Sequence, residues 1–363
     1  MKKKVLSIML ATVMVCSLAA CGNSSGEKAP EPDNTSAETE PAAEAEQPEA
    51  DTEEVPSEET ETLADVRFAI VANNSVGDKG FCDLSNEGIE KAAADFGVEY
   101  KIFSCNNDST IYLDTIKTAA ENYDVVFLVT GYFFDDELKE VQAMYPDTKY
   151  IYIDGETEQE GAVSVTYMQN EGAFLAGYLA ALISETGKVG FVGGADWPVI
   201  HDYEVGFKAG VEYAENSVEV VSRYTNDHFD AALGKTTAKA CYDDGCDVIF
   251  QAAGPAGLGV LEAAEENGFL AIGVDTDQGY MQPGHIVSSM LKRVDTSIYD
   301  IIEKCKNGEE LESAYVYNVA NGGISLADNE YYQELVSEEN RNKVDELVTA
   351  ITNGEVTIPS YYD

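Results

Sequence analysis

Residues 247–268, DVIFQAAGPAGLGVLEAAEENG, have the pattern of a strand, a turn and a helix in succession. An apolar run of strand length leads into a glycine-rich turn, and the turn leads into a stretch with the apolar spacing of an amphipathic helix. The same alternation recurs along the chain from Val66 onward. Strands this apolar, separated by helices, are typical of parallel sheets covered on both faces. The sequence therefore predicts an α/β fold.

The alternation falls into two series, 66–165 and 187–290, and each supports a doubly wound parallel-sheet lobe. The strand-like runs are VRFAIVAN, VEYKIFS, DVVFLVT, KYIYID, AVSVTY, KVGFVGG, VEVVSRY, DVIFQAA, LAIGVD, IVSSML and, nearer the end, YVYNVA. Roughly 300 residues exceed the size at which one core usually stops growing. We expect an N-terminal lobe of 66–168 plus 290–314, and a C-terminal lobe of 169–289 plus 315–363.

The first residues, MKKKVLSIMLATVMVCSLAAC, combine a basic start, an apolar run and a stop of small residues. This pattern predicts a secretory signal, residues 1–20, that is too short to span a membrane. The stop resembles a bacterial lipobox, in which Cys21 is lipidated and becomes the mature N-terminus. The alternative is an ordinary signal peptide that contains a cysteine.

Residues 21–65 are predicted to form a disordered acidic tether behind the lipidated cysteine. They hold about fifteen Asp and Glu against one Lys, with no aromatic residue. Such a segment cannot bury enough apolar surface to offset its ordering entropy, and as a flexible coil it reaches on the order of 35 Å. The formal net charge of the whole chain is −45, which makes nucleic acid an unsuitable partner.

The glycine-rich turn at 251–259 does not match a phosphate-binding loop. It lacks both the G-x-G-x-x-G fingerprint at the start of a domain and the terminal Gly-Lys-Ser/Thr of a Walker loop. Glycines can instead let the main chain approach a flat ligand and offer N–H donors at a helix start. The alternative is a tight strand-to-helix turn that contacts no ligand.

Charged residues follow several of the predicted strands, where open α/β sheets bind ligands. Asp275 and Asp277 follow one strand, and Asp154 ends another. Carboxylates accept the paired hydrogen bonds of a sugar diol, although a lone acid after a strand is also a common helix cap. Lys292 follows a strand of small and apolar residues, where a buried ammonium needs anionic or hydroxyl partners; otherwise it is an exposed lysine.

Two phenylalanines, Phe81 in GDKGFCD and Phe229 in YTNDHFD, follow strands and have polar neighbours. They are poor core residues and good stacking faces, so one from each lobe could hold a planar base. Four aromatics are weaker candidates: Tyr132, Phe134, Trp197 and Tyr203.

The remaining polar residues indicate no catalytic site. His201 and His228 lie in strand-end loops, on the wall or the rim of a cleft, without a Cys or Ser placed for activation. No His or Cys cluster suggests a metal, and we expect no cofactor. Cys241 and Cys246 could pair if a helix ends between them; otherwise the cysteines are free.

The chain resembles the basic membrane protein (PnrA-like) family, the lipoprotein substrate-binding components of ABC importers. The stretches that carry the resemblance are GDKGFCDLSNEG, QNEGAFLAGYLAAL, TGKVGFVGGADWPVIHDYEVGFKAGVEY, YDDGCDVIFQAAGPAGLGVLEAAEENG, AIGVDTDQ and SSMLKRVD. They cover most of residues 66–300. The resemblance implies a type I periplasmic binding protein fold, with two lobes joined by a three-strand hinge and the ligand between them.

Transferred position by position, the resemblance implies stacking rings at Phe81 and Phe229 and a carboxylate at Asp154. It implies a backbone contact from Gly254 or Gly257. It also implies that Lys292 and either Asp275 or Asp277 hold a ribose. The family usually has asparagine where this chain has Cys82, which leaves the identity of the base open.

The resemblance implies a lipid-anchored, extracytoplasmic receptor, monomeric and not an enzyme, that captures a nucleoside, with a purine nucleoside favoured. It would deliver this ligand to an ABC permease and its ATPase. Three alternatives remain: a binder of free sugar or a furanose-like signal, a nucleoside-hydrolysing enzyme, and a surface protein without a small ligand.

Overall fold

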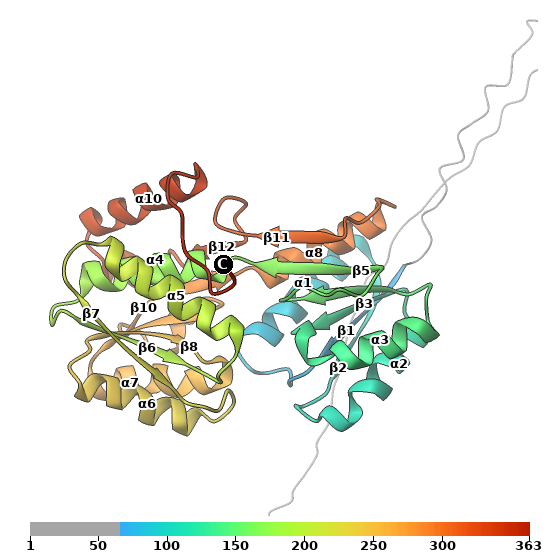
Figure 1. Ribbon diagram of the computed structural model, residues 1–363, viewed down its shortest axis with the longest axis horizontal. Helices are drawn as coiled ribbons and strands as arrows, with labels where there is room; N and C mark the ends of the chain where they lie inside the picture. The colour runs from blue at the N-terminus through green and yellow to red at the C-terminus, as the bar shows by residue number, and fades with distance from the viewer. Residues whose placement is uncertain (1–65) are drawn as a thin grey trace, which may run out of the picture. The chain divides into compact units, whose positions relative to one another are not determined.

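The computed structural model describes residues 66–363, and these residues form two six-stranded sheets flanked by helices (Figure 1). The predicted signal peptide, Cys21 and the tether lie outside the described residues. We call the sheet that contains β1 the first sheet and the one that contains β6 the second. Each sheet, with its helices, is a lobe.

The first sheet is parallel throughout, in the order β11-β5-β4-β3-β1-β2. Its strands are β1 (Arg67–Ala72), β2 (Glu99–Ser104), β3 (Val125–Val129), β4 (Lys149–Ile153), β5 (Ala162–Tyr167) and β11 (Ala314–Tyr317).

The second sheet repeats this order as β12-β10-β9-β8-β6-β7, with the last strand, β12, antiparallel to β10. Its strands are β6 (Lys188–Gly193), β7 (Glu219–Tyr224), β8 (Val248–Ala252), β9 (Leu270–Asp275), β10 (Ile286–Lys292) and β12 (Ile324–Leu326).

Helices cover both faces of each sheet. In the second lobe α6 and α7 pack on one face and α4 and α5 on the other (Figure 1). In the first lobe α2 packs on β1 and β3, and α1 packs against α8. The helices are α1 (Phe81–Phe96), α2 (Tyr112–Asn122), α3 (Asp135–Met144), α4 (Gln169–Ile183), α5 (Pro198–Tyr213), α6 (Ala231–Asp243), α7 (Gly257–Asn267), α8 (Val294–Lys306), α9 (Glu330–Leu335) and α10 (Glu338–Thr352).

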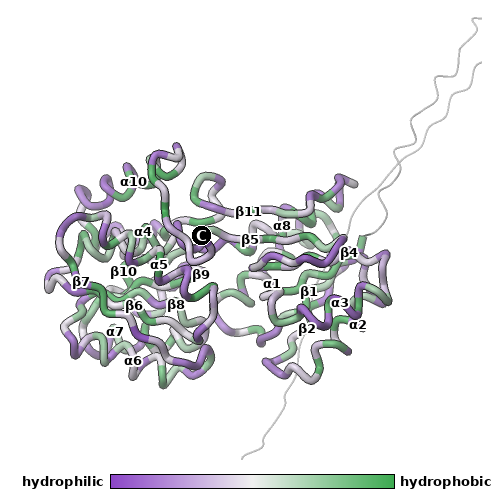
Figure 2. Tube along the Cα trace, viewed as in Figure 1, coloured by the Kyte–Doolittle hydropathy of each residue, from purple (hydrophilic) through white to green (hydrophobic). Residues whose placement is uncertain are grey.

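Successive side chains of a strand point to opposite faces of the sheet. Because helices cover both faces, both sets of side chains are buried. In β1, Phe68 and Ile70 join the large core cluster, whereas Ala69 and Val71 face the cluster under α2 and α3. The central strands accordingly carry mostly hydrophobic residues, and polar residues gather on the outer helices and loops (Figure 2). The prediction of doubly wound parallel sheets is confirmed.

The chain crosses between the sheets three times. It passes from the first to the second sheet after β5, returns after β10 to form α8 and β11, and passes again to β12. The expected lobe division differs from the structure at two strands. Ala314–Tyr317 pairs with β5 in the first sheet, although residues from 315 onward are predicted to belong to the C-terminal lobe. An edge position in either sheet suits so short a strand, so its local pattern cannot tell them apart. The end of β10, residues 290–292, pairs in the second sheet, although the prediction places 290–314 in the N-terminal lobe.

Two smaller expectations concern cysteines and membrane helices. α6 does end at Asp243, between Cys241 and Cys246, but both thiols are free and buried. Of the helices described in residues 66–363, none combines the length and the apolar character that crossing a bilayer requires.

Candidate functional site

A pocket lies where the carboxyl ends of the two sheets face each other. Residues that follow β1, β3 and β4 of the first sheet line it, together with residues that end or follow β6, β7, β8, β9 and β10 of the second. Doubly wound sheets place their ligands at this edge because neighbouring parallel strands end there and their loops diverge. Six predicted site residues line the pocket: Phe81, Asp154, Phe229, Gly254, Asp275 and Lys292.

Two aspartates hold the loop that presents Phe81. The Asp78 carboxylate accepts hydrogen bonds from the backbone N–H groups of Gly80 (3.1 Å), Cys82 (3.0 Å) and Asp83 (3.1 Å). Asp83 in turn accepts from the N–H groups of Gly77 and Lys79. Because these bonds satisfy the free N–H groups at the start of α1, the loop is rigidly shaped and Phe81 projects at the pocket wall.

Phe229 reaches the same pocket from the loop between β7 and α6. Its backbone N–H donates to the Asp227 carboxylate at 2.8 Å. Asp230 then caps α6 by accepting from the N–H of Ala232 at 2.8 Å. Phe229 keeps 39% of its surface exposed, so part of its ring is free to contact a ligand in the pocket that it lines.

Lys292 forms a buried ion pair with Asp154 across the two sheets, since Lys292 ends β10 and Asp154 follows β4. The lysine is 1% exposed, and its Nζ lies 5.4 Å from the centroid of the Phe81 ring. It also lies 5.1 Å from the Tyr167 ring and 5.6 Å from the Tyr203 ring. The ammonium is thus surrounded by π faces, which attract cations, with one direct anionic partner.

Asp275 is a second buried carboxylate in this cluster. Its side chain is directed toward α1, with Oδ2 3.8 Å from the position that a Cβ on Gly80 would take. Both Asp154 (φ +72°) and Asp275 (φ +68°) have left-handed backbones where their strands end. Such conformations cost energy in residues other than glycine and cluster at functional sites. Here they turn two carboxylates off the sheet edges into one pocket.

Burial dominates the ionisation of this cluster. It raises the pKa of Asp275 to about 7, with the Lys292 ammonium opposing the rise and Asp154 and Asp78 adding to it. Burial likewise raises the pKa of Asp154, again against the effect of Lys292. Two buried carboxylates therefore share the favourable charge of one ammonium. Hydrogen-bond donors from a ligand would stabilise the charged forms of these carboxylates further.

Two predicted site residues, Gly257 and Asp277, lie outside the pocket wall. The Asp277 carboxylate accepts from the Asn329 side chain at 2.7 Å and from the Gly279 N–H at 3.0 Å, so it anchors a turn. A Cβ on Gly257 would lie 1.9 Å from Oε1 of Gln251. Of the two pairs left open by the sequence, Asp275 and Gly254 line the pocket, and Asp277 and Gly257 do not.

Close packing explains the glycines of the 254–259 turn. A Cβ on Gly254, which has φ +52°, would lie 2.3 Å from Nε2 of His228. A Cβ on Gly259 would lie 1.8 Å from the carbonyl oxygen of Ala231 in α6. Each glycine makes room for a specific neighbour, and Gly254 alone of the turn's glycines also lines the pocket.

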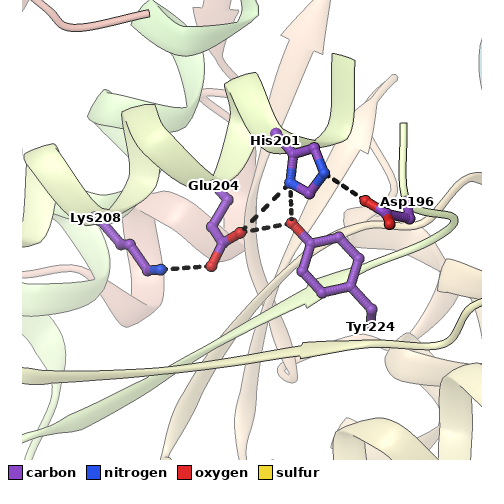
Figure 3. A network of polar contacts seen from close by, with 5 residues as sticks. All are labelled: Asp196, His201, Glu204, Lys208 and Tyr224. Carbon is purple, nitrogen blue, oxygen red and sulfur yellow. Dashed lines mark hydrogen bonds and ion pairs between the residues drawn. The ribbon is translucent and has the colours of Figure 1, made fainter. Parts of the chain in front are cut away.

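The two histidines that follow strands have different positions. His228 lines the pocket. His201, in the first turns of α5, belongs to a network outside the pocket wall that joins Asp196, Tyr224, Glu204 and Lys208 (Figure 3). Its Nε2 lies 2.5 Å from Asp196 and its Nδ1 3.1 Å from the Tyr224 hydroxyl. This network ties the loop before α5 to β7.

The weaker aromatic candidates also divide. Tyr132, Trp197 and Tyr203 line the pocket, whereas Phe134 is fully buried in the core beside Tyr112. The neighbouring Phe133, which sequence reasoning missed, takes the wall position. It lies one residue earlier in a short 3-10 turn, Gly131–Phe133, whose geometry the sequence pattern does not reveal.

Polar amides on the wall were missed as well. Asn73 directly follows β1, and its Oδ1 accepts from the Thr130 hydroxyl at 2.5 Å. The Gln278 amide donates to the carbonyl of Lys79 at 3.3 Å, which links the two lobes across the pocket. Their positions after strand ends were a usable signal, but an amide in a loop has no spacing pattern that marks it as a site residue.

A family model described as "ABC transporter substrate-binding protein PnrA-like" matches residues 66–361. The protein named basic membrane protein A2 of Borrelia garinii subsp. bavariensis is 30% identical over 81% of this chain and 88% of that protein. The protein named ABC transporter nucleoside-binding protein BmpA of Lactococcus lactis subsp. cremoris is 31% identical over 82% of this chain and 90% of that protein.

Solved structures agree with this match. A crystal structure of an ABC transporter solute-binding protein from Aeropyrum pernix K1 superimposes with a TM-score of 0.74. It is 26% identical, and the alignment covers 81% of this chain and 94% of that one. A solute-binding protein from Conexibacter woesei shares the fold with a TM-score of 0.69 at 22% identity.

Proposed function

Because the chain belongs to the PnrA-like family of ABC transporter substrate-binding proteins, we propose that it captures a nucleoside in the pocket between its lobes. The ligand we favour is a purine nucleoside, delivered to an ABC permease and its ATPase. The name of the Lactococcus lactis relative, a nucleoside-binding protein, supports this choice. The protein acts by binding and release and performs no chemistry on its ligand.

The observation that carries the proposal is the pairing of two kinds of surface in one pocket. Phe81 and Phe229 come from different lobes and offer apolar faces, while Lys292, Asp154 and Asp275 form a buried acid–ammonium cluster. A nucleoside has the matching halves: a flat base for stacking and a ribose diol for charge-assisted hydrogen bonds. A free sugar would leave the two rings without a planar partner.

The roles follow from this match. Phe81 and Phe229 stack on the base, Asp275 and Lys292 hold the ribose hydroxyls, and Gly254 lets the main chain approach the ligand closely. Asp154 keeps the ammonium in place and faces the ligand from the first lobe. Since these groups come from both lobes, a closed cleft and a bound ligand favour each other.

Membrane attachment belongs to the same proposal. Lipidated Cys21 would anchor a monomer on the extracytoplasmic face, with residues 22–65 as the tether that lets the binding lobes reach the permease. Mass spectrometry of protein from the native membrane tests the anchor, because a diacylglyceryl thioether adds a defined mass to a peptide that starts at Cys21.

A thermal-shift panel tests the ligand class. Purine nucleosides at about 100 times their dissociation constant should stabilise the protein by about 2.7 kcal/mol, a melting shift of several degrees. Ribose and free bases at equal concentration should shift it much less, because each satisfies only one half of the pocket. A shift with pentoses alone would support the sugar-binding alternative and contradict the proposal.

A further inference from the structure

The imidazole of His228 occupies a defined place in the pocket wall. Its ring packs on Trp197 with centroids 4.7 Å apart, and it meets the Phe229 ring edge-on at 5.7 Å and 82°. The backbone is fixed too, because the His228 carbonyl accepts from the N–H of Ala256 at 3.1 Å. The ring therefore has little freedom to rotate away.

The surrounding backbone is shaped around this ring. A Cβ on Gly194 would lie 2.1 Å from Nδ1, and a Cβ on Gly254 would lie 2.3 Å from Nε2. Gly194 and Gly254 follow the adjacent strands β6 and β8, so two glycines at neighbouring strand ends make a slot for one imidazole. Gly254 and His228 both line the pocket, and Nε2 is the ring nitrogen on the Gly254 side.

The polar atoms of this ring are incompletely satisfied. Nδ1 is buried and has no hydrogen-bond partner within residues 66–363. A buried polar atom without a partner costs about 1–3 kcal/mol, so packing alone would favour an apolar residue here. Burial also lowers the pKa of His228 to about 4, against the opposing charge of Asp227. At neutral pH the uncharged ring has one donor and one acceptor nitrogen.

The separation between the His228 imidazole and the acid–ammonium cluster is short enough for a single nucleoside to contact both. Lys292 ends β10 and Asp275 ends β9, while the His228 slot lies at the ends of β8 and β6, and the sheet order is β10-β9-β8-β6. With strands about 4.8 Å apart, imidazole and carboxylate are separated by on the order of 10 Å. A ligand held at its ribose by Asp275 would place the far edge of its base near the imidazole.

We propose that His228 hydrogen-bonds the polar edge of the base and so helps to determine which bases the pocket accepts. This inference rests on the proposed function. A neutral imidazole can donate to a ring nitrogen or carbonyl and can accept from an amino group, depending on its tautomer. The wall therefore accommodates both 6-oxo and 6-amino purines and discriminates against a base whose edge has no polar group.

Calorimetry with three ribosides tests this assignment: adenosine, purine riboside, which lacks the 6-amino group, and 7-deazaadenosine, which lacks N7. In the wild-type protein at least one analogue should bind about 3- to 10-fold more weakly than adenosine, the effect of one neutral hydrogen bond. In His228→Phe, which keeps an aromatic ring against Trp197, this difference should disappear. His228→Gln retains a donor and an acceptor and should preserve it.

His201→Phe is the matched control, because His201 lies outside the pocket wall and its substitution should leave the analogue preference unchanged. His228→Leu replaces the phenylalanine variant if that protein loses its cooperative melting transition. The proposed role of His228 would be overturned if wild type and the apolar variants showed equal analogue preferences, or if wild type showed no preference. Either result would leave the proposed nucleoside binding intact. Failure of wild type to bind any of the three ribosides would overturn the proposed function as well.

Discussion

Phe229 is an exposed aromatic ring held by a capped loop, and its partner Phe81 projects from a loop tied by two aspartates. Phe229 belongs to no core cluster, whereas Phe81 is partly buried against the large one. Both are placed where a planar ligand would cover them. At the scale of single residues, this placement makes the two rings the first positions to test.

Phe81→Ala and Phe229→Ala should each weaken nucleoside binding by about tenfold or more, since stacking of a base on an aromatic ring contributes about 1–3 kcal/mol. Titration calorimetry with adenosine measures the change. Tyr280→Ala is the matched control, because Tyr280 is 62% exposed and lies outside the pocket wall. Unchanged affinity in both phenylalanine variants would show that the base does not stack there.

At pH 8, where Asp275 is ionised, Asp275→Ala should weaken nucleoside binding by about 10- to 100-fold, because a hydrogen bond to a charged group contributes about 1.5–3 kcal/mol. Asp277→Ala is its matched control, because it removes the hydrogen bond from Asn329 that anchors a turn. It should lower the free energy of unfolding by about 1 kcal/mol and leave the affinity for the nucleoside unchanged. Calorimetry together with denaturant unfolding separates the two effects. The reverse pattern would assign the ribose to Asp277.

The raised pKa of Asp275, about 7, predicts how stability depends on pH. The folded protein keeps a proton on this carboxyl that the unfolded chain releases above about pH 4. Between about pH 4 and 7 the free energy of unfolding should therefore fall as pH rises, by up to about 1.4 kcal/mol per pH unit from this group.

Asp275→Asn cannot ionise and should lose this part of the pH dependence. Urea unfolding of both proteins without ligand, at pH 5, 6 and 7, measures the difference in slope. Parallel slopes would mean that Asp275 is already ionised at pH 5 in the folded protein.

The site could be predicted from the sequence as far as strand ends identify it. Asp154, Lys292 and the two phenylalanines each follow an apolar strand and fall on the pocket wall. Asp275 and Asp277 are two residues apart, but Asp275, which has a left-handed backbone, lines the pocket and Asp277 does not. The sequence does not reveal that conformation, so it leaves open which of the two faces the pocket.

At the scale of elements, α4 and α5 pack unusually closely through glycines. A Cβ on Gly177 would lie 2.1 Å from the carbonyl oxygen of Phe207, and one on Gly210 would lie 2.0 Å from that of Phe174. These are backbone atoms of the facing helix and cannot rotate aside. The packed helices α4 and α5 fix the position of Trp197, which directly precedes α5 and lines the pocket.

Gly177→Ala should destabilise the protein by about 1–3 kcal/mol through this overpacking, although alanine ordinarily stabilises a helix by up to about 1 kcal/mol relative to glycine. Thermal and denaturant unfolding measure the change. Glu212→Ala, at an exposed position of α5, should stay within about 0.5 kcal/mol of wild type. A stabilised Gly177→Ala protein would show that the helices can move apart freely.

The strands were predictable because their apolar runs are continuous, and eleven of the runs appear as β1 to β11. β12 was missed because Ile324–Leu326 is only three residues long. β11 was placed in the wrong lobe because pairing partners depend on the path of the chain between the sheets, which a local pattern does not contain. Tertiary geometry decides such edge strands.

At the scale of the whole described chain, the contacts that bridge the lobes beside the pocket include the Lys292–Asp154 ion pair and the Gln278 hydrogen bond to Lys79. Both use residues that the ligand would also meet. Binding and closure should therefore stabilise each other, since a ligand that contacts both lobes favours the state in which they are close. The proposed delivery of the ligand to a permease would require this property.

A crystal structure of the protein with bound adenosine would show directly where the base and the ribose lie. The base should lie between the rings of Phe81 and Phe229, with the ribose hydroxyls within hydrogen-bonding distance of Asp275 and Lys292. Adenosine bound away from either ring, or with its ribose directed out of the pocket and its base against the acid–ammonium cluster, would contradict this prediction.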